Sequence, residues 1–114
     1  PNIAAVAAIA PVTDWRDLAE FAADRDRSDI AALRLSQYAD SLAGKRLFTV
    51  IGNADQRVST ASCCRLFSSM VEANLRHGRD LSQLEFHCCA MGEPGHVVDD
   101  PWRRLGAEFL LKTA

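Results

Sequence analysis

Two side chains suited to acid–base chemistry follow successive apolar runs of this sequence. Asp55 comes shortly after the run 46–51, His96 comes after the run 84–89, and a helix-length segment separates the two. In open parallel α/β sheets, functional groups gather at the carboxyl ends of the strands. A carboxylate there can fix the tautomer of a histidine and stabilise the imidazolium that forms when the histidine takes a proton from serine. The order Asp then His therefore predicts the acid and the base of a serine hydrolase triad.

The same two residues also have plainer interpretations. An aspartate after a strand often serves only to hold a loop, and a histidine in a glycine-containing loop is often solvent-exposed. The chain is then a non-enzymatic α/β binding or interaction module, and the distance between the Asp55 carboxylate and the His96 ring decides between the two hypotheses. His77 and His87 are weaker catalytic candidates, because the first ends a predicted helix, where a cation suits the helix dipole, and the second lies within a predicted strand.

The elements that must position these residues alternate along the chain. Apolar composition predicts strands at 3–9, 46–51 and 84–89. Helical spacing and capping residues predict helices at 15–23, 28–37, 59–77 and from Asp99 or Asp100 onward. Strands separated by helices imply right-handed crossovers and a parallel sheet. We therefore expect one α/β domain over residues 1–114, with about three parallel strands flanked by helices in three layers.

The longest predicted helix has clear signals at both ends. Ser59 or Thr60 is suited to cap its N-terminus, and Gly78 is suited to end it. Helical spacing predicts a buried side formed by Leu66, Met70, Ala73 and Leu75.

Composition disfavours several classes of function. The 114 residues carry a net charge of −2 and 48% hydrophobic residues, which gives no basic surface for nucleic acid. The apolar run 3–9 is too short to span a bilayer. No glycine-rich phosphate loop follows a predicted strand, which disfavours a flavodoxin-like or nucleotide-binding domain. We therefore expect neither a nucleic acid nor a membrane as a partner.

The four cysteines form two adjacent pairs, Cys63-Cys64 and Cys88-Cys89. Neither pair has the C-x-x-C spacing of a zinc site or a redox motif. Neighbouring side chains on a strand point to opposite faces, so Cys88 and Cys89 are poorly placed to hold one ion together. We expect no metal site, and reduced, mostly buried thiols that behave as small apolar groups in a cytoplasmic protein.

Three segments resemble a known family. Asp55-Gln56-Arg57-Val58 resembles the Asp-x-Arg-Val segment of α/β-hydrolases of the prolyl oligopeptidase and dienelactone hydrolase type. Residues 86–96, with the helix that follows, resemble the final strand, Gly-His loop and last helix of those enzymes. Residues 4–15 are similar to the strand that follows their nucleophile helix. The resemblance implies the C-terminal part of an α/β-hydrolase fold.

The family also implies roles for individual residues. Asp55 matches the triad acid, and His96 matches the general base. Arg57 matches an arginine that binds substrate in the peptidase branch. Trp15 is a further substrate-binding candidate, although a tryptophan packed beneath its helix is the plainer interpretation. The implied substrate is a small-molecule ester or a peptide, and the implied chemistry needs no metal or organic cofactor.

The nucleophile of this family has no counterpart in the sequence. No serine is flanked by glycines in the pattern G-x-S-x-G that the resemblance requires. The resemblance therefore implies that residues 1–114 are the C-terminal portion of one catalytic domain, with the serine upstream of Pro1. We expect the chain alone to be inactive, and sticky or poorly stable because of an uncovered strand edge at 3–9.

Overall fold

The computed structural model describes residues 2–90 and 100–112 and contains a three-stranded parallel sheet. The strands are β1 (Ala5–Ile9), β2 (Arg46–Gly52) and β3 (Leu84–Cys89), in the spatial order β1-β2-β3. All three predicted strands are confirmed, with small differences at their ends. The α/β class and the parallel sheet predicted from the alternation of elements are also confirmed.

The central strand β2 is held by both neighbours and is the most buried part of the sheet. Its register places Val50 beside Ile9 of β1, and Gly52 beside Cys89 of β3. Every residue from Phe48 to Gly52 is buried. Because the strands are parallel, β2 and β3 end at the same edge of the sheet, and the segments that leave them begin side by side.

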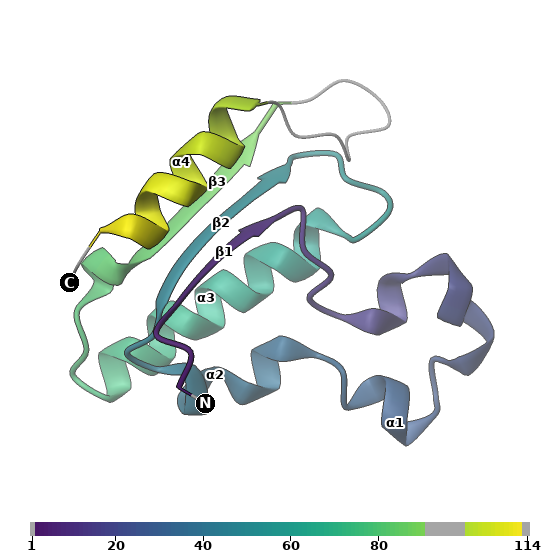
Figure 1. Ribbon diagram of the computed structural model, residues 1–114. Helices are drawn as coiled ribbons and strands as arrows, with labels where there is room; N and C mark the ends of the chain where they lie inside the picture. The colour runs from purple at the N-terminus through teal and green to yellow at the C-terminus, as the bar shows by residue number, and fades with distance from the viewer. Residues whose placement is uncertain (1, 91–99, 113–114) are drawn as a thin grey trace.

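Two helices cover opposite faces of the sheet, as Figure 1 shows. Helix α4 (Asp100–Leu111) packs its Phe109 and Gly106 against Phe48 of β2. Helix α3 (Thr60–Arg76) covers the other face and joins the hydrophobic core beneath the sheet. The arrangement has three layers, with the sheet in the middle.

Helix α3 begins and ends where the sequence predicts. Ser59 is its N-cap, with a hydroxyl that accepts a hydrogen bond from Ser62 N at 3.1 Å. The backbone of Ser59 has a φ of +69°, which is uncommon for a residue other than glycine. Gly78 follows the helix with a φ of +62°, as a helix-terminating glycine commonly does. The predicted buried side is confirmed at Leu66, Met70 and Ala73 and wrong at Leu75, which is 62% exposed.

The helices predicted at 15–23 and 28–37 are wrong as continuous helices. The chain there forms short turns: η1 (Trp15–Asp17), η2 (Ala19–Asp24), α1 (Ser28–Ala31), η3 (Leu35–Tyr38) and α2 (Ala39–Leu42). The physical reason is competition from longer-range backbone hydrogen bonds. Trp15 N donates to Leu33 O at 3.2 Å, and Leu35 N donates to Thr13 O at 2.9 Å. These bonds tie the two halves of the segment together and interrupt the local helical pattern.

Candidate active site

Asp55 lies at the carboxyl edge of the sheet, in the connection between β2 and α3. It is only 5% exposed. Its Oδ1 accepts hydrogen bonds from the backbone N–H groups of Arg57 and Val58, both at 2.9 Å. The sequence-predicted acid is therefore a buried carboxylate in a fixed turn at the predicted edge.

A threonine hydroxyl fixes the backbone of the same connection. The N–H of Asp55 donates to Thr60 Oγ1 at 3.0 Å, and that hydroxyl donates to Gly52 O at 2.6 Å. Thr60, the first residue of α3, is thus linked both to the end of β2 and to the backbone of the aspartate. A carboxylate that accepts two backbone hydrogen bonds, on a backbone tied by Thr60, has little freedom to move, which suits a residue whose role is to orient a neighbour.

The end of β3 lies next to this connection. Asn53 N donates a hydrogen bond to Cys89 O at 2.8 Å, immediately beyond the paired residues of the two strands. The chain that leaves β3 therefore starts beside the segment that carries Asp55. His96, the predicted base, lies outside the described residues.

The two predicted substrate-binding residues, Arg57 and Trp15, differ in exposure and in the residues that they contact. Arg57 is on the surface, with a side chain that is 63% exposed and an Nη2 that lies 3.7 Å from Glu20 Oε1. Trp15 is 39% exposed, with its ring centroid 5.4 Å from that of Phe21. The interpretation of Trp15 as a side chain packed beneath a helix is wrong, because η1 is a single short turn at the surface. The Arg57–Glu20 pair joins the Asp55 connection to η2.

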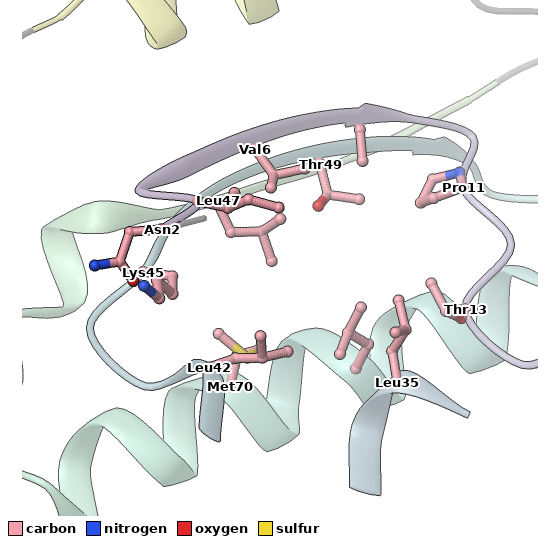
Figure 2. Close-up of a pocket in the computed structure, with 13 residues that line it drawn as sticks. Asn2, Val6, Pro11, Thr13, Leu35, Leu42, Lys45, Leu47, Thr49 and Met70 are labelled. Carbon is pink, nitrogen blue, oxygen red and sulfur yellow. The ribbon is translucent and has the colours of Figure 1, made fainter. Parts of the chain in front are cut away.

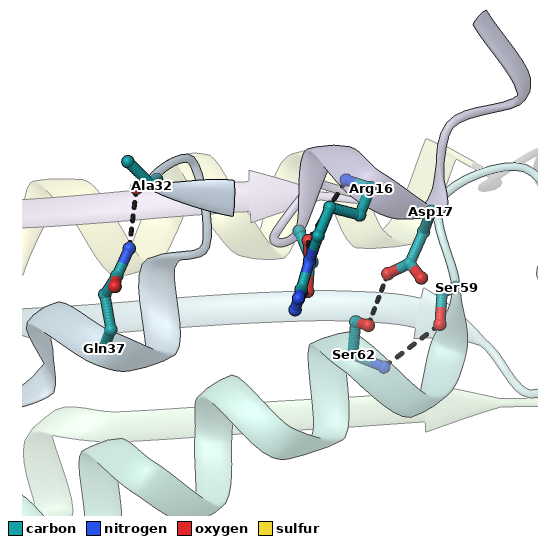
Figure 3. Close-up of polar contacts among 7 residues, drawn as sticks. Arg16, Asp17, Ala32, Gln37, Ser59 and Ser62 are labelled. Atoms are coloured by element: carbon teal, nitrogen blue, oxygen red, sulfur yellow. Dashed lines mark hydrogen bonds and ion pairs between the residues drawn. The ribbon is translucent and has the colours of Figure 1, made fainter. Parts of the chain in front are cut away.

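A polar cluster that the sequence analysis missed ties η1 to the start of α3, as Figure 3 shows. The side chain of Arg16 donates two hydrogen bonds to the carboxylate of Asp14, from Nε to Oδ1 at 2.9 Å and from Nη2 to Oδ2 at 2.6 Å. These bonds hold the pKa of Asp14 below its ordinary value, against the opposing effect of burial. The hydroxyl of Ser62 donates to the Asp17 carboxylate. An aspartate followed two residues later by arginine was the only sequence signal for this cluster.

The cluster borders a polar cleft of about 340 Å³. Three carboxylates and three guanidinium groups line it: Asp14, Asp17, Asp26, Arg16, Arg25 and Arg65. Because the charges balance, the cleft has no net preference for an anion or a cation.

An apolar groove of about 420 Å³ lies between the sheet and the helical layer below it, as Figure 2 shows. Asn2 and Lys45 lie at one end of the groove, and Pro11 and Thr13 lie toward the other. Thr13 and Thr49 line it, and their buried hydroxyls have no hydrogen-bond partner among the described residues. The groove therefore offers a mainly apolar surface with two buried polar atoms.

The cysteines are free and differ in exposure. Cys63 is buried, and desolvation raises the pKa of its thiol to about 12. Cys64 and Cys89 are half-buried, and Cys88 is exposed, so the prediction of mostly buried thiols is wrong for Cys88. Within residues 2–90 and 100–112, no three histidine, cysteine or acidic side chains are grouped so that they could hold a metal ion.

Searches of family models, curated proteins and solved structures find no match to this chain. No helix in the described part of the chain has the length and apolar character needed to cross a membrane.

Proposed function

We propose that this chain supplies the acid and the general base of a serine hydrolase that acts on an ester or a peptide bond. The observation that carries the proposal is the position of Asp55, a buried carboxylate in a fixed turn directly after the central parallel strand. Functional groups of open α/β sheets gather at this edge. The resemblance of 55–58 to the triad-acid segment of prolyl oligopeptidase and dienelactone hydrolase types supports the same assignment.

In the proposed reaction, His96 takes the proton of a serine hydroxyl as the serine attacks the substrate carbonyl. His96 then gives that proton to the leaving group. Asp55 holds the imidazole in the tautomer that can accept the proton and stabilises the imidazolium that forms. The serine and the donors that stabilise the oxyanion belong to a segment outside this sequence, because no G-x-S-x-G is present. The chemistry uses no metal or organic cofactor.

One direct test of the acid–base pair uses this chain as it is. The ¹⁵N shifts of the histidine ring nitrogens report which nitrogen carries the proton. We expect Asp55→Asn to change the tautomer of His96 and to leave His77 and His87, in the same spectrum, unchanged. Asp80→Asn is a matched control, since Asp80 is an exposed aspartate that also accepts a backbone hydrogen bond. An unchanged His96 in the Asp55→Asn spectrum would remove the basis of the proposal.

A second test addresses the reaction itself. The upstream coding sequence is expected to contain a G-x-S-x-G between a strand and a helix. In the full-length protein, Asp55→Asn is expected to lower kcat by about 10³- to 10⁴-fold with little change in fold, as for the acid of other triads. An upstream sequence without the motif, or full activity in Asp55→Asn, contradicts the assignment.

A non-enzymatic binding module remains a second candidate, and the apolar groove favours it. Its volume of about 420 Å³ falls in the range of small-molecule pockets, and the hydroxyl of Thr49, which has no partner among the described residues and points toward the groove in Figure 2, can bond an occupant. On this hypothesis, Asp55 serves only to fix its turn. The module is favoured if Asp55→Asn leaves the His96 tautomer unchanged while Thr49→Val weakens the binding of a small probe that carries a hydrogen-bonding group.

A further inference from the structure

Cys64 of α3 and Cys88 of β3 lie on the same side of the sheet, the side that α3 covers. Phe86 of β3 points to this face, because its ring stacks on Phe67 of α3 with centroids 4.9 Å apart. Cys88 follows Phe86 by two residues on the strand and so points to the same face. Cys64 precedes Phe67 by three residues, and residues three apart are neighbours on a helix surface.

The directions of the two elements bring Cys64 and Cys88 together. Helix α3 starts at the carboxyl edge, where Thr60 bonds to Gly52 at the end of β2, and so runs opposite to the strands. Moving toward the N-terminus of α3 therefore follows the same direction in space as moving toward the C-terminus of β3. Three helical residues rise about 4.5 Å and two strand residues about 6.6 Å, so the cysteines are the next facing pair after the stacked rings. Burial raises the pKa of the Cys64 thiol, and the nearby Cys88 thiol raises it further.

The other two cysteines are placed differently. Cys63 is buried against Ile51 and Val58. Cys89 points to the opposite face of the sheet and packs in the cluster that contains Phe109 of α4. Cys88 is the exposed member of the four, so a soluble oxidant reaches its sulfur first.

We propose that Cys64 and Cys88 are a redox site that forms a reversible disulfide between α3 and β3. With a peroxide as oxidant, the Cys88 thiolate attacks one oxygen, the O–O bond breaks, and a sulfenic acid and one water form. The sulfur of Cys64 then attacks the sulfenic sulfur, the S–O bond breaks, and a second water leaves. The two thiols lose two electrons and two protons in total, and the peroxide is reduced to water. A dithiol reverses the link by exchange.

The double variant Cys63→Ala/Cys89→Ser isolates the proposed pair. After treatment with hydrogen peroxide, we expect a monomer that has lost two hydrogen atoms and resists alkylation until a dithiol is added. The link joins positions 64 and 88, which are separated by 24 positions in the sequence. It is expected to raise the Tm by roughly 10 °C, because a disulfide restricts the unfolded chain. The matched variant Cys64→Ser/Cys88→Ser keeps Cys63 and Cys89 and is expected to form no internal link.

The wild-type chain provides a measurement that needs no variant. Trypsin places Cys63-Cys64 in one peptide and Cys88-Cys89 in another, so fragmentation of the cross-linked product identifies the sulfurs that are joined. A Cys64–Cys88 link supports the proposal. A link between other cysteines, links between molecules only, or oxidation of Cys88 to a sulfinic acid without a link overturns it.

Discussion

Replacing Asp55 by alanine removes the acceptor of two backbone hydrogen bonds in the β2–α3 connection. The donor at Val58 is buried, and a buried donor left without a partner costs about 1–3 kcal/mol. The donor at Arg57 is only partly buried, and its lost bond costs about 0.5–1 kcal/mol. The expected loss of stability is therefore about 2–3 kcal/mol, or a Tm lower by roughly 10 °C in a domain of this size.

Asparagine at the same position separates the turn from the proposed chemistry. Its side-chain oxygen can accept both backbone hydrogen bonds, so Asp55→Asn is expected to lose less than about 1 kcal/mol. Urea unfolding followed by circular dichroism measures both variants, with the midpoint and the slope fitted separately. Asp80→Ala is the control, because it removes a similar backbone bond at an exposed turn and should cost less than Asp55→Ala. The reasoning is refuted if the asparagine variant is as unstable as the alanine variant, or if the alanine variant loses less than about 0.5 kcal/mol.

Three further predictions concern the core, the polar cluster and the sheet edge. Phe48→Ala is expected to cost about 3–5 kcal/mol in urea unfolding, because Phe48 is 1% exposed between the sheet and α4; a loss below about 2 kcal/mol would contradict that packing. The lowered pKa of Asp14 means that its pairing with Arg16 stabilises the fold at neutral pH and that this contribution fades as the pH falls through the folded-state pKa, below about 4. Asp14→Asn should therefore flatten the acid side of the stability–pH curve, and an unchanged curve would count against the pairing. Val6 lies on the edge strand β1 and is 41% exposed, and Ile3, which precedes the strand, is 63% exposed. Val6→Lys is therefore expected to reduce concentration-dependent light scattering, and unchanged scattering would show that this edge is not the surface through which molecules associate.

The sequence alone predicts the elements that bury apolar side chains at a regular spacing. Strand β2 is an apolar and β-branched run, and the sheet buries it from Phe48 to Gly52. Helix α3 has a cap at Ser59, a terminating Gly78 and three correctly spaced core residues between them. In these elements, local propensity and tertiary packing favour the same conformation, so the pattern identifies the structure.

The segment 13–43 shows why the rest was not predictable. The pattern Trp15, Leu18, Ala19 and Ala22 has helical spacing, yet none of these residues is buried. An antiparallel backbone bridge between Asp14 and Arg34 holds the segment instead, and the side-chain hydrogen bonds of Arg16 to Asp14 fix its first turn. The bridge joins residues 20 positions apart, and neither propensity nor periodicity contains information about such a contact.

The candidate site is predictable from the sequence in one respect and not in another. The position of Asp55 follows from the strand before it, whereas the use of its Oδ1 to fix the turn depends on backbone geometry that no spacing rule describes. A structural role for this oxygen does not compete with an acid–base role, because an aspartate that orients a histidine must itself be held in place. The turn supplies that support through Arg57 N, Val58 N and Thr60 Oγ1. The comparison of Asp55→Asn with Asp55→Ala distinguishes the two roles, since asparagine keeps the turn and loses the negative charge that would orient His96.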